Sequence, residues 1–249
     1  MGNDIFERIE KKYRINGVQK DALLQGIGSR LLEDKFCRST IHSLYLDTPD
    51  HRIIRKSIEA KGCSAYKEKL RVRSYGTPGP EDKVFFELKK KYKGIVYKRR
   101  TCMTRTEAER YLEQGILPED SQIMREIDYA MNYYGRLRPA VMICYEREAY
   151  AIKDYPALRI TFDSGVRYRD RELSLGKGSQ GIPITGKDEY LLEIKSDGAL
   201  PLWLTEILDR NKVFPSSFSK YGTAYRMMQE SGIDTQEFIG GLKNNVIDF

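Results

Sequence analysis

The chain has 249 residues, of which 40% are hydrophobic and 32% charged, and its formal net charge is +7. Such a length allows one large domain or two small ones, and apolar residues spread along the chain exclude extensive disorder. The basic excess favours a polyanionic partner, but charge alone leaves nucleic acid, an anionic membrane and a phosphorylated metabolite open.

The predicted strands show alternating polar and apolar residues, bounded by glycine, proline or polar turns. In chain order they cover residues 5–15, 43–48, 65–75, 84–92, 95–103, 139–150, 157–168 and 189–196. The fourth and fifth follow each other so closely that we expect a tight hairpin around Lys93–Gly94. A glycine-rich loop at 176–186 separates the last two strands.

Apolar residues at helical spacing predict the remaining elements. In chain order these helices cover 17–33, a segment after Pro49, 105–114, 119–134, 201–211 and 219–231. Thr104 and Ser121 are among the candidate N-caps. Helices and strands do not alternate regularly, which disfavours a doubly wound parallel sheet. With no linker to divide it, the chain is predicted to form one α+β domain over residues 1–231, followed by a C-terminal tail at 232–249.

The cysteines and the apolar segments predict a location. Cys37, Cys63, Cys102 and Cys144 form no CxxC pair and show no short regular spacing. We therefore expect reduced thiols, no zinc site and a cytoplasmic protein. The first residues lack the apolar segment of a signal peptide, and no apolar run is long enough to cross a bilayer, so we expect no membrane segment in this chain.

Charged residues alternate with apolar ones along the strands, which gives most strands a charged face. Lys69, Arg71 and Arg73 share a face opposite Leu70 and Val72. The pattern recurs at Glu87 and Lys89, Lys98 and Arg100, Tyr145 and Arg147, Arg159 and Asp163, and Glu193 and Lys195. This face is either the solvated side of a half-buried sheet or the lining of a barrel with helices outside. Because like charges on neighbouring strands repel, a basic lining would be compensated by an anion. Periodicity alone leaves both interpretations open.

Eight short segments, taken in order, resemble a known family. They are ERIEKKY (7–13), SLYLDT (43–48), KLRVRSY (69–75), FELKKKYKGIVYKRR (86–100), CYEREAY (144–150), LRITFD (158–163), LLEIK (191–195) and FSKY (218–221). Together they resemble the catalytic domain of the VTC (vacuolar transporter chaperone) family, a branch of the triphosphate tunnel metalloenzymes. The resemblance implies an eight-stranded antiparallel closed β-barrel with helices packed outside. It also implies a polyphosphate polymerase that transfers the γ-phosphate of a nucleoside triphosphate, with ATP as the expected donor, to a growing polyphosphate chain.

The resemblance also implies the roles of individual residues. The expected phosphate-binding catalytic residues are Lys12, Arg71, Arg73, Lys89, Lys98, Arg147, Arg159 and Lys220. Tyr145, Lys195 and Ser219 are expected to bind substrate. Glu193, with Glu10 as a second candidate, is expected to hold a divalent metal, Mn²⁺ or Mg²⁺. Arginine forks and lysine point charges suit phosphate oxygens, and carboxylates suit a hard cation, so these roles agree with the residue types.

One position departs from the wider superfamily, whose members often begin with Glu-x-Glu-x-Lys. Here Arg8 stands at the first glutamate position, which favours the polymerase over a triphosphatase or a cyclase. An inorganic triphosphatase and a non-catalytic polyphosphate-binding module remain the alternatives. The basic run at 89–94 lacks the interleaved aromatic residues of a base-stacking surface, so no nucleic-acid partner is expected.

Overall fold

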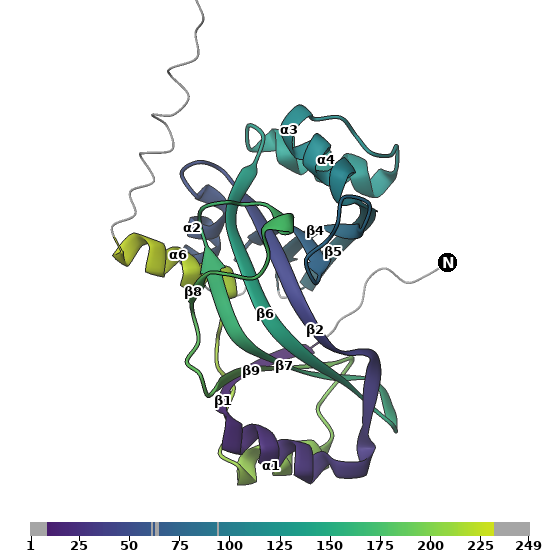
Figure 1. Ribbon diagram of the computed structural model, residues 1–249. Helices are drawn as coiled ribbons and strands as arrows, with labels where there is room; N and C mark the ends of the chain where they lie inside the picture. Colours follow the sequence, from purple (N-terminus) through teal and green to yellow (C-terminus); the bar gives the residue numbers. More distant parts are fainter. Residues whose placement is uncertain (1–8, 61, 63–64, 94, 232–249) are drawn as a thin grey trace, which may run out of the picture.

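The structure, a computed structural model, describes residues 9–60, 62, 65–93 and 95–231 (Figure 1). An antiparallel sheet dominates it, in the order β1-β9-β7-β6-β2-β3-β4-β5, with the short β8 paired to β7. The strands are β1 (Ile9–Asn16), β2 (Leu31–Asp47), β3 (Lys67–Tyr75), β4 (Lys83–Tyr92), β5 (Ile95–Thr104), β6 (Arg138–Ile152), β7 (Tyr155–Arg169), β8 (Ile182–Pro183) and β9 (Glu189–Ser196).

Helices cover the outside and one end of this sheet. They are α1 (Gly17–Ile27), α2 (Arg52–Glu59), α3 (Arg105–Gln114), α4 (Gln122–Tyr133), α5 (Leu202–Arg210) and α6 (Lys220–Glu230), with short 3₁₀ helices at Gly28–Arg30 and Leu175–Lys177. In the described part of the chain, none of these helices is long and apolar enough to cross a membrane. The antiparallel sheet with helices packed on it confirms the predicted α+β class.

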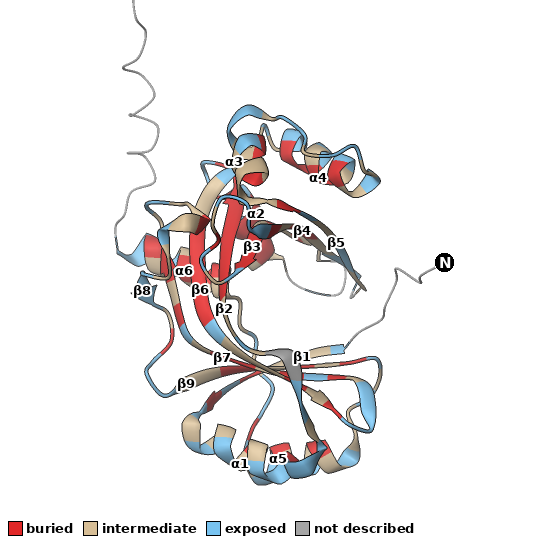
Figure 2. Cartoon of the chain, turned by 45° about the vertical axis from the view of Figure 1, so that its right-hand side comes forward, coloured by how far each residue is buried: buried red, intermediate tan, exposed pale blue. Residues whose placement is uncertain are grey.

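The sheet curves strongly but does not close. Figure 2 shows the edge strands β1 and β5 facing each other across its open side, and no backbone pairing joins them among the described residues. The predicted closed barrel is therefore not confirmed, because β1 pairs only with β9 and β5 only with β4. An ion pair between Lys89 on β4 and Glu10 on β1, at 3.4 Å, nevertheless spans the opening. Register shifts in β2 and β6 contribute to the bend, as bulges do in other sheets.

Two hydrophobic cores lie on the convex side of the sheet. Helices α3 and α4 bury Tyr111 and Ile127 against the apolar face of β2, β3 and β4, including Phe86. Helices α1 and α5 bury residues such as Leu23 against the apolar face of β1, β6, β7 and β9, including Phe162. Each fully buried side chain of this size contributes roughly 1.5–3 kcal/mol. Because these cores occupy the convex side, the charged residues that alternate with the core residues face the concave side on most strands.

A third core closes one end of the concave side. There α6 packs Tyr221, Ala224 and Met228 against β2, β6 and β7, and Ile54 of α2 joins them. Tyr221 also donates a hydrogen bond of 2.9 Å to the buried carboxylate of Asp47. Helix α6 therefore begins inside the curve of the sheet, and its first residues lie next to the charged strands.

Most element boundaries follow the predictions to within about three residues, and the largest departure lies between residues 28 and 42. The short β8 and the 3₁₀ helix Leu175–Lys177 fall in or beside the predicted loop at 176–186, and residues 5–8 of the first predicted strand lie outside the described residues. The predicted helix over 17–33 ends at Ile27, because Gly28 takes a positive φ of 54° and a 3₁₀ turn leads into β2. Strand β2 then starts at Leu31, well before the predicted residue 43. Thr104 and Ser121 cap α3 and α4 with their side chains, as predicted. The hairpin prediction falls partly on Gly94, which lies outside the described residues, although Lys93 beside it has a φ of 49°.

Candidate functional site

The strand registers place charged residues of neighbouring strands side by side on the concave side. Tyr45, Arg71, Glu87 and Arg100 stand opposite one another across four strands, from β2 to β5. Directly paired residues of a sheet share a face. We call this surface the concave face, and its main polar residues are Glu10, Lys12, Tyr45, Lys69, Arg71, Arg73, Glu87, Lys89, Lys98, Arg100, Tyr145, Arg147, Arg159, Thr161, Asp163, Glu193 and Lys195. Lysines and arginines clearly outnumber carboxylates on it.

Glu87 is the shared counter-ion of the cations on β3 and β5. Its side chain is only 2% exposed, and Arg71 contacts one carboxylate oxygen through two nitrogens at 2.6 and 2.7 Å. Lys98 contacts the other oxygen at 2.7 Å, with Arg100 at 3.6 Å. Burial raises the pKa of Glu87, but Arg71, Arg73 and Lys98 outweigh that effect and hold the pKa far below its usual value. Glu87 therefore stays ionised and fixes the direction of the arginines around it.

Asp163 is the shared counter-ion of Arg147 on β6 and Lys220 on α6. Arg147 grips it with two parallel hydrogen bonds of 2.6 and 2.7 Å, and Lys220 at the start of α6 contacts it at 2.6 Å. Burial raises the pKa of Asp163, yet Lys220 and Arg147 lower it below its usual value. This bonding orients Arg147 and ties the first turn of α6 to β7. Ser219, the N-cap of α6, also accepts a hydrogen bond of 2.9 Å from Lys69.

Glu10 and Glu193, the predicted metal ligands, meet at Lys12. The Lys12 ammonium lies 3.1 Å from Glu10 and 3.8 Å from Glu193, and Lys195 contacts Glu193 at 2.7 Å. Burial and their mutual repulsion raise the pKa of Glu10, but Lys89, Lys12 and Lys195 lower it overall. Burial also raises the pKa of Glu193, and Lys195, Lys12 and Arg147 lower it far more. Both carboxylates are therefore ionised next to each other, which is the state a hard cation requires.

The donor set fits a divalent cation that also contacts phosphate. Mg²⁺-type sites in phosphoryl-transfer proteins use one or two carboxylates and complete their shell with water and substrate oxygens. Glu10 and Glu193 supply two carboxylates, and the buried hydroxyl of Thr161, paired with Glu193 in register, has no hydrogen-bond partner among the described residues. No group of three or more His, Cys, Asp or Glu side chains capable of holding a metal occurs in that part of the chain. The protein alone therefore supplies only part of a metal shell.

All the residues predicted for the site lie on the concave face or at the start of α6. Arg73 reaches the Tyr145 hydroxyl at 3.2 Å, which links β3 to β6. Arg159 is the least connected of the set, because it is exposed and has no ion-pair partner in the described structure. Arg8, the position that departs from the superfamily pattern, lies outside the described residues.

Sequence reasoning missed several residues of this surface. Glu87 and Asp163 were recognised as members of the charged face but not as the counter-ions that organise it. Lys69 has the same alternation as Arg71, so periodicity could have added it to the site. A tyrosine with an ordinary pKa is neutral at pH 7, so the alternation of charged and apolar residues did not indicate Tyr45. Its place became evident only from its hydrogen bond of 3.1 Å from Arg71.

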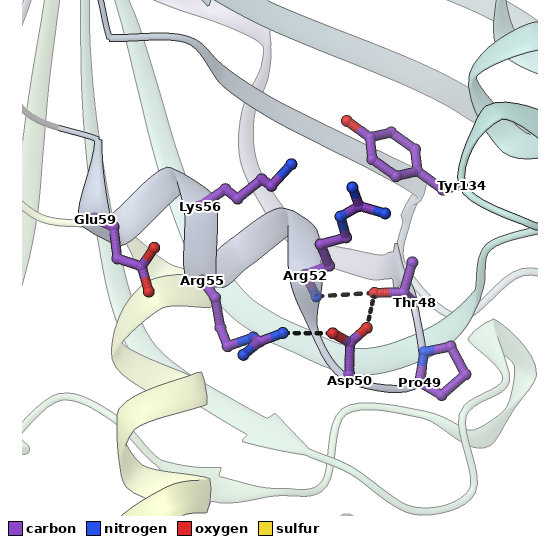
Figure 3. Close-up of a pocket in the computed structure, with 8 residues that line it drawn as sticks. All are labelled: Thr48, Pro49, Asp50, Arg52, Arg55, Lys56, Glu59 and Tyr134. Carbon is purple, nitrogen blue, oxygen red and sulfur yellow. Dashed lines mark hydrogen bonds and ion pairs between the residues drawn. The ribbon is translucent and has the colours of Figure 1, made fainter.

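A separate pocket of about 530 Å³ lies beside α2, away from these residues (Figure 3). Arg52 and Lys56 extend along one side of it toward Tyr134, while Arg55 pairs with Asp50 on the other side. None of its lining residues belongs to the concave face. Its cations are exposed residues of a surface helix, so we do not assign the chemistry to it.

The fold is similar to two solved structures. The first is a candidate adenylate cyclase from Bacillus halodurans, with 16% identity, a TM-score of 0.53, and coverage of 88% of this chain and 96% of that one. The second is a candidate adenylyl cyclase from Hippeastrum described as having a dominant triphosphatase activity, with 16% identity, a TM-score of 0.50, and coverage of 90% and 96%. At this identity, the likeness establishes the fold alone.

The sequence itself establishes the family. No curated protein matches the chain. A family model described as the VTC domain, however, matches residues 7–229. That match spans nearly the whole length and includes every described strand and nearly all of the last helix. The chain therefore belongs to the VTC domain family.

Proposed function

We propose that this protein is a metal-dependent polyphosphate polymerase that transfers the γ-phosphate of ATP to a growing polyphosphate chain. The observation that carries the proposal is the cation excess of the concave face. Its most buried carboxylates, Glu87 and Asp163, are already fully engaged with cations. The remaining positive charge extends from β5 to β1 and needs an extended polyanion to compensate it.

The proposed reaction suits what these side chains do. Phosphoryl transfer needs little covalent chemistry from the protein, because most of the rate comes from positioning and charge neutralisation. Arg71, Arg73 and Arg147 offer guanidinium forks whose directions are fixed by Glu87, Tyr145 and Asp163. These groups would orient the phosphates of donor and acceptor end to end.

The remaining predicted residues would complete the phosphate cradle. Lys12, Lys89, Lys98, Lys195 and Lys220 would add point charges along the chain. Arg159, which has no carboxylate partner among the described residues, would meet phosphates at the exposed end of the face.

Glu10 and Glu193 would hold the Mn²⁺ or Mg²⁺ ion. When bound, such an ion neutralises charge on the phosphate oxygens and bridges them to the protein. Lys12 lies between the two carboxylates and would keep them ionised and apart before the ion arrives. The free thiols of Cys37, Cys102 and Cys144 agree with a cytoplasmic location, which we also propose.

An inorganic triphosphatase is the second candidate. The Hippeastrum protein, which is similar in fold, is described as having a dominant triphosphatase activity. The same cationic face would neutralise the charge of a triphosphate before hydrolysis. The two candidates differ in the acceptor, which is a phosphate chain in one case and water in the other. We prefer the polymerase because Arg8 replaces a carboxylate typical of the hydrolytic relatives.

The test is incubation of the purified protein with ATP and Mn²⁺, with products resolved on a polyphosphate-staining gel and by a free-phosphate assay. Long chains together with ADP would support the polymerase. Free phosphate without chains would support the triphosphatase instead. Tight polyphosphate binding without turnover would leave only a binding module.

A further inference from the structure

Lys69 lies among cations of the concave face, whose own carboxylate partners are Glu10 for Lys12 and Lys89, and Glu87 for Arg71. It faces Lys12 of β1 and Lys89 of β4, with Arg71 next but one on its own strand, and these groups disfavour a further positive charge. No carboxylate of the described residues lies within ion-pair distance of its ammonium. Its hydrogen bond goes instead to the neutral hydroxyl of Ser219, the N-cap of α6, at 2.9 Å. Every other lysine considered above on this face has a carboxylate partner.

The acidic group that most favours a positive charge on Lys69 is the phenol of Tyr45. Its hydroxyl accepts a hydrogen bond of 3.1 Å from Arg71, and its ring packs on Tyr221 of α6 at a centroid distance of 4.9 Å. Tyr45 is only 6% exposed. It marks the boundary where the cationic part of the face meets the apolar core beneath α6. Lys69 and Tyr45 therefore form the inner end of the charged surface.

We propose that Lys69 and Tyr45 form a proton-coupled phosphate subsite, in which binding of one phosphate group of the chain is accompanied by proton uptake from solvent. This proposal rests on the proposed function, because it assumes that a phosphate chain occupies the concave face. Before binding, a tyrosinate at Tyr45 partly compensates the cations. When a phosphate supplies that negative charge, the tyrosinate oxygen gains a proton from the buffer, and a neutral Lys69 amine gains one as well.

The electrostatics of both groups support this exchange. Burial lowers the pKa of Lys69, and Lys12, Lys89 and Arg71 lower it further to about 8, although Tyr45 opposes them. Burial raises the pKa of Tyr45, but Arg71, Lys69 and Arg73 more than offset it and bring it to about 7. An incoming phosphate adds negative charge, which raises both pKa values. By linkage, phosphate affinity must then fall as the pH rises through these values.

The experiment is titration calorimetry of the full chain with inorganic tripolyphosphate, without metal, in two buffers of different ionisation enthalpy. The titration is run at two pH values, one a unit below the pKa of Tyr45 and the other a unit above the pKa of Lys69. We expect the wild type to take up more protons at the higher pH, and its affinity to fall up to about tenfold per pH unit for each group that titrates. Near-ultraviolet absorbance at the higher pH should show loss of a tyrosinate band as tripolyphosphate is added.

Two variants assign the protons, and a third is the control. Lys69→Arg keeps the positive charge but cannot titrate, so its uptake at the higher pH should fall by about one proton relative to wild type. Tyr45→Phe should abolish the absorbance change. Lys56→Arg on α2 is the matched control and should behave as wild type. Any change in the protonation of tripolyphosphate itself is the same for all variants, so it drops out when they are compared. Circular dichroism establishes that each variant is folded.

The outcomes separate this proposal from the proposed function. If the wild type binds tripolyphosphate with no pH-dependent proton uptake and no absorbance change, the subsite is wrong even if ATP turnover is observed. Equal uptake by Lys69→Arg and wild type would likewise remove Lys69 from it. Failure of the wild type to bind tripolyphosphate at all would overturn both proposals.

Discussion

Replacing Glu87 by glutamine tests whether this carboxylate organises the cationic face. The change keeps the shape of the side chain but removes its charge. Arg71 then loses its ionic contacts of 2.6 and 2.7 Å, and Lys98 loses its contact of 2.7 Å. Removing one partner of a buried ion pair costs about 3–5 kcal/mol, because the other charge stays uncompensated.

The cost at Glu87 should be smaller than that full range. The Arg71 side chain is 22% exposed and that of Lys98 is 46% exposed, so water recovers part of their solvation. We therefore expect a loss of about 2–3 kcal/mol in the free energy of unfolding. In a chain of this size, that corresponds to a decrease in melting temperature of roughly 4–12 °C.

The measurement is urea denaturation of wild type and Glu87→Gln, each with and without tripolyphosphate. Because bound phosphate replaces the missing negative charge, the ligand should stabilise the variant more than the wild type. Burial raises the pKa of Glu87 but the neighbouring cations lower it overall, so its stabilisation is present above the unfolded pKa of about 4.3 and is lost as the pH falls toward the folded value. Glu126→Gln, which breaks a half-buried pair with Arg99, is the control and should cost at most about 1 kcal/mol. Equal stability of the two variants would refute the reasoning.

Other parts of the face give further predictions. Glu193→Gln should abolish metal-dependent turnover yet leave tripolyphosphate binding intact in calorimetry; unchanged turnover would contradict its role as a ligand. Combined Arg71→Ala and Arg73→Ala substitutions should weaken tripolyphosphate binding by about 100-fold or more, since each charge-assisted contact contributes about 1.5–3 kcal/mol; unchanged affinity would show that phosphates bind elsewhere. Asp163→Asn should lower stability by about 3 kcal/mol, because Arg147 and Lys220 are both largely buried. A thermal melt indistinguishable from wild type would argue against that buried network.

The sequence predicted most of the strands because their side chains alternate cleanly. The strand at 189–196 and the helix at 105–114 agree with the structure at both ends. Strand β2 was predicted too short, because its longer first part, residues 31–42, lacks that alternation while still pairing with β6. Whether the sheet closes could not be read from periodicity either, since closure depends on long-range pairing of β1 with β5.

The charged face was predictable from the sequence, but its internal bonding was not. Alternation placed Arg71 and Arg147 on one surface, and the family resemblance suggested that this surface binds phosphate. Their counter-ions Glu87 and Asp163 depend on which strands are neighbours, and this is settled only by the fold. The same holds for Tyr45, whose pKa of about 7 arises from cations on another strand.

The most direct test of this account is a crystal structure of the protein with tripolyphosphate. The account predicts phosphate density along the concave face, in contact with Arg71, Arg73 and Arg147. Density in the pocket beside Arg52 and Lys56 (Figure 3), with the concave face empty, would contradict it.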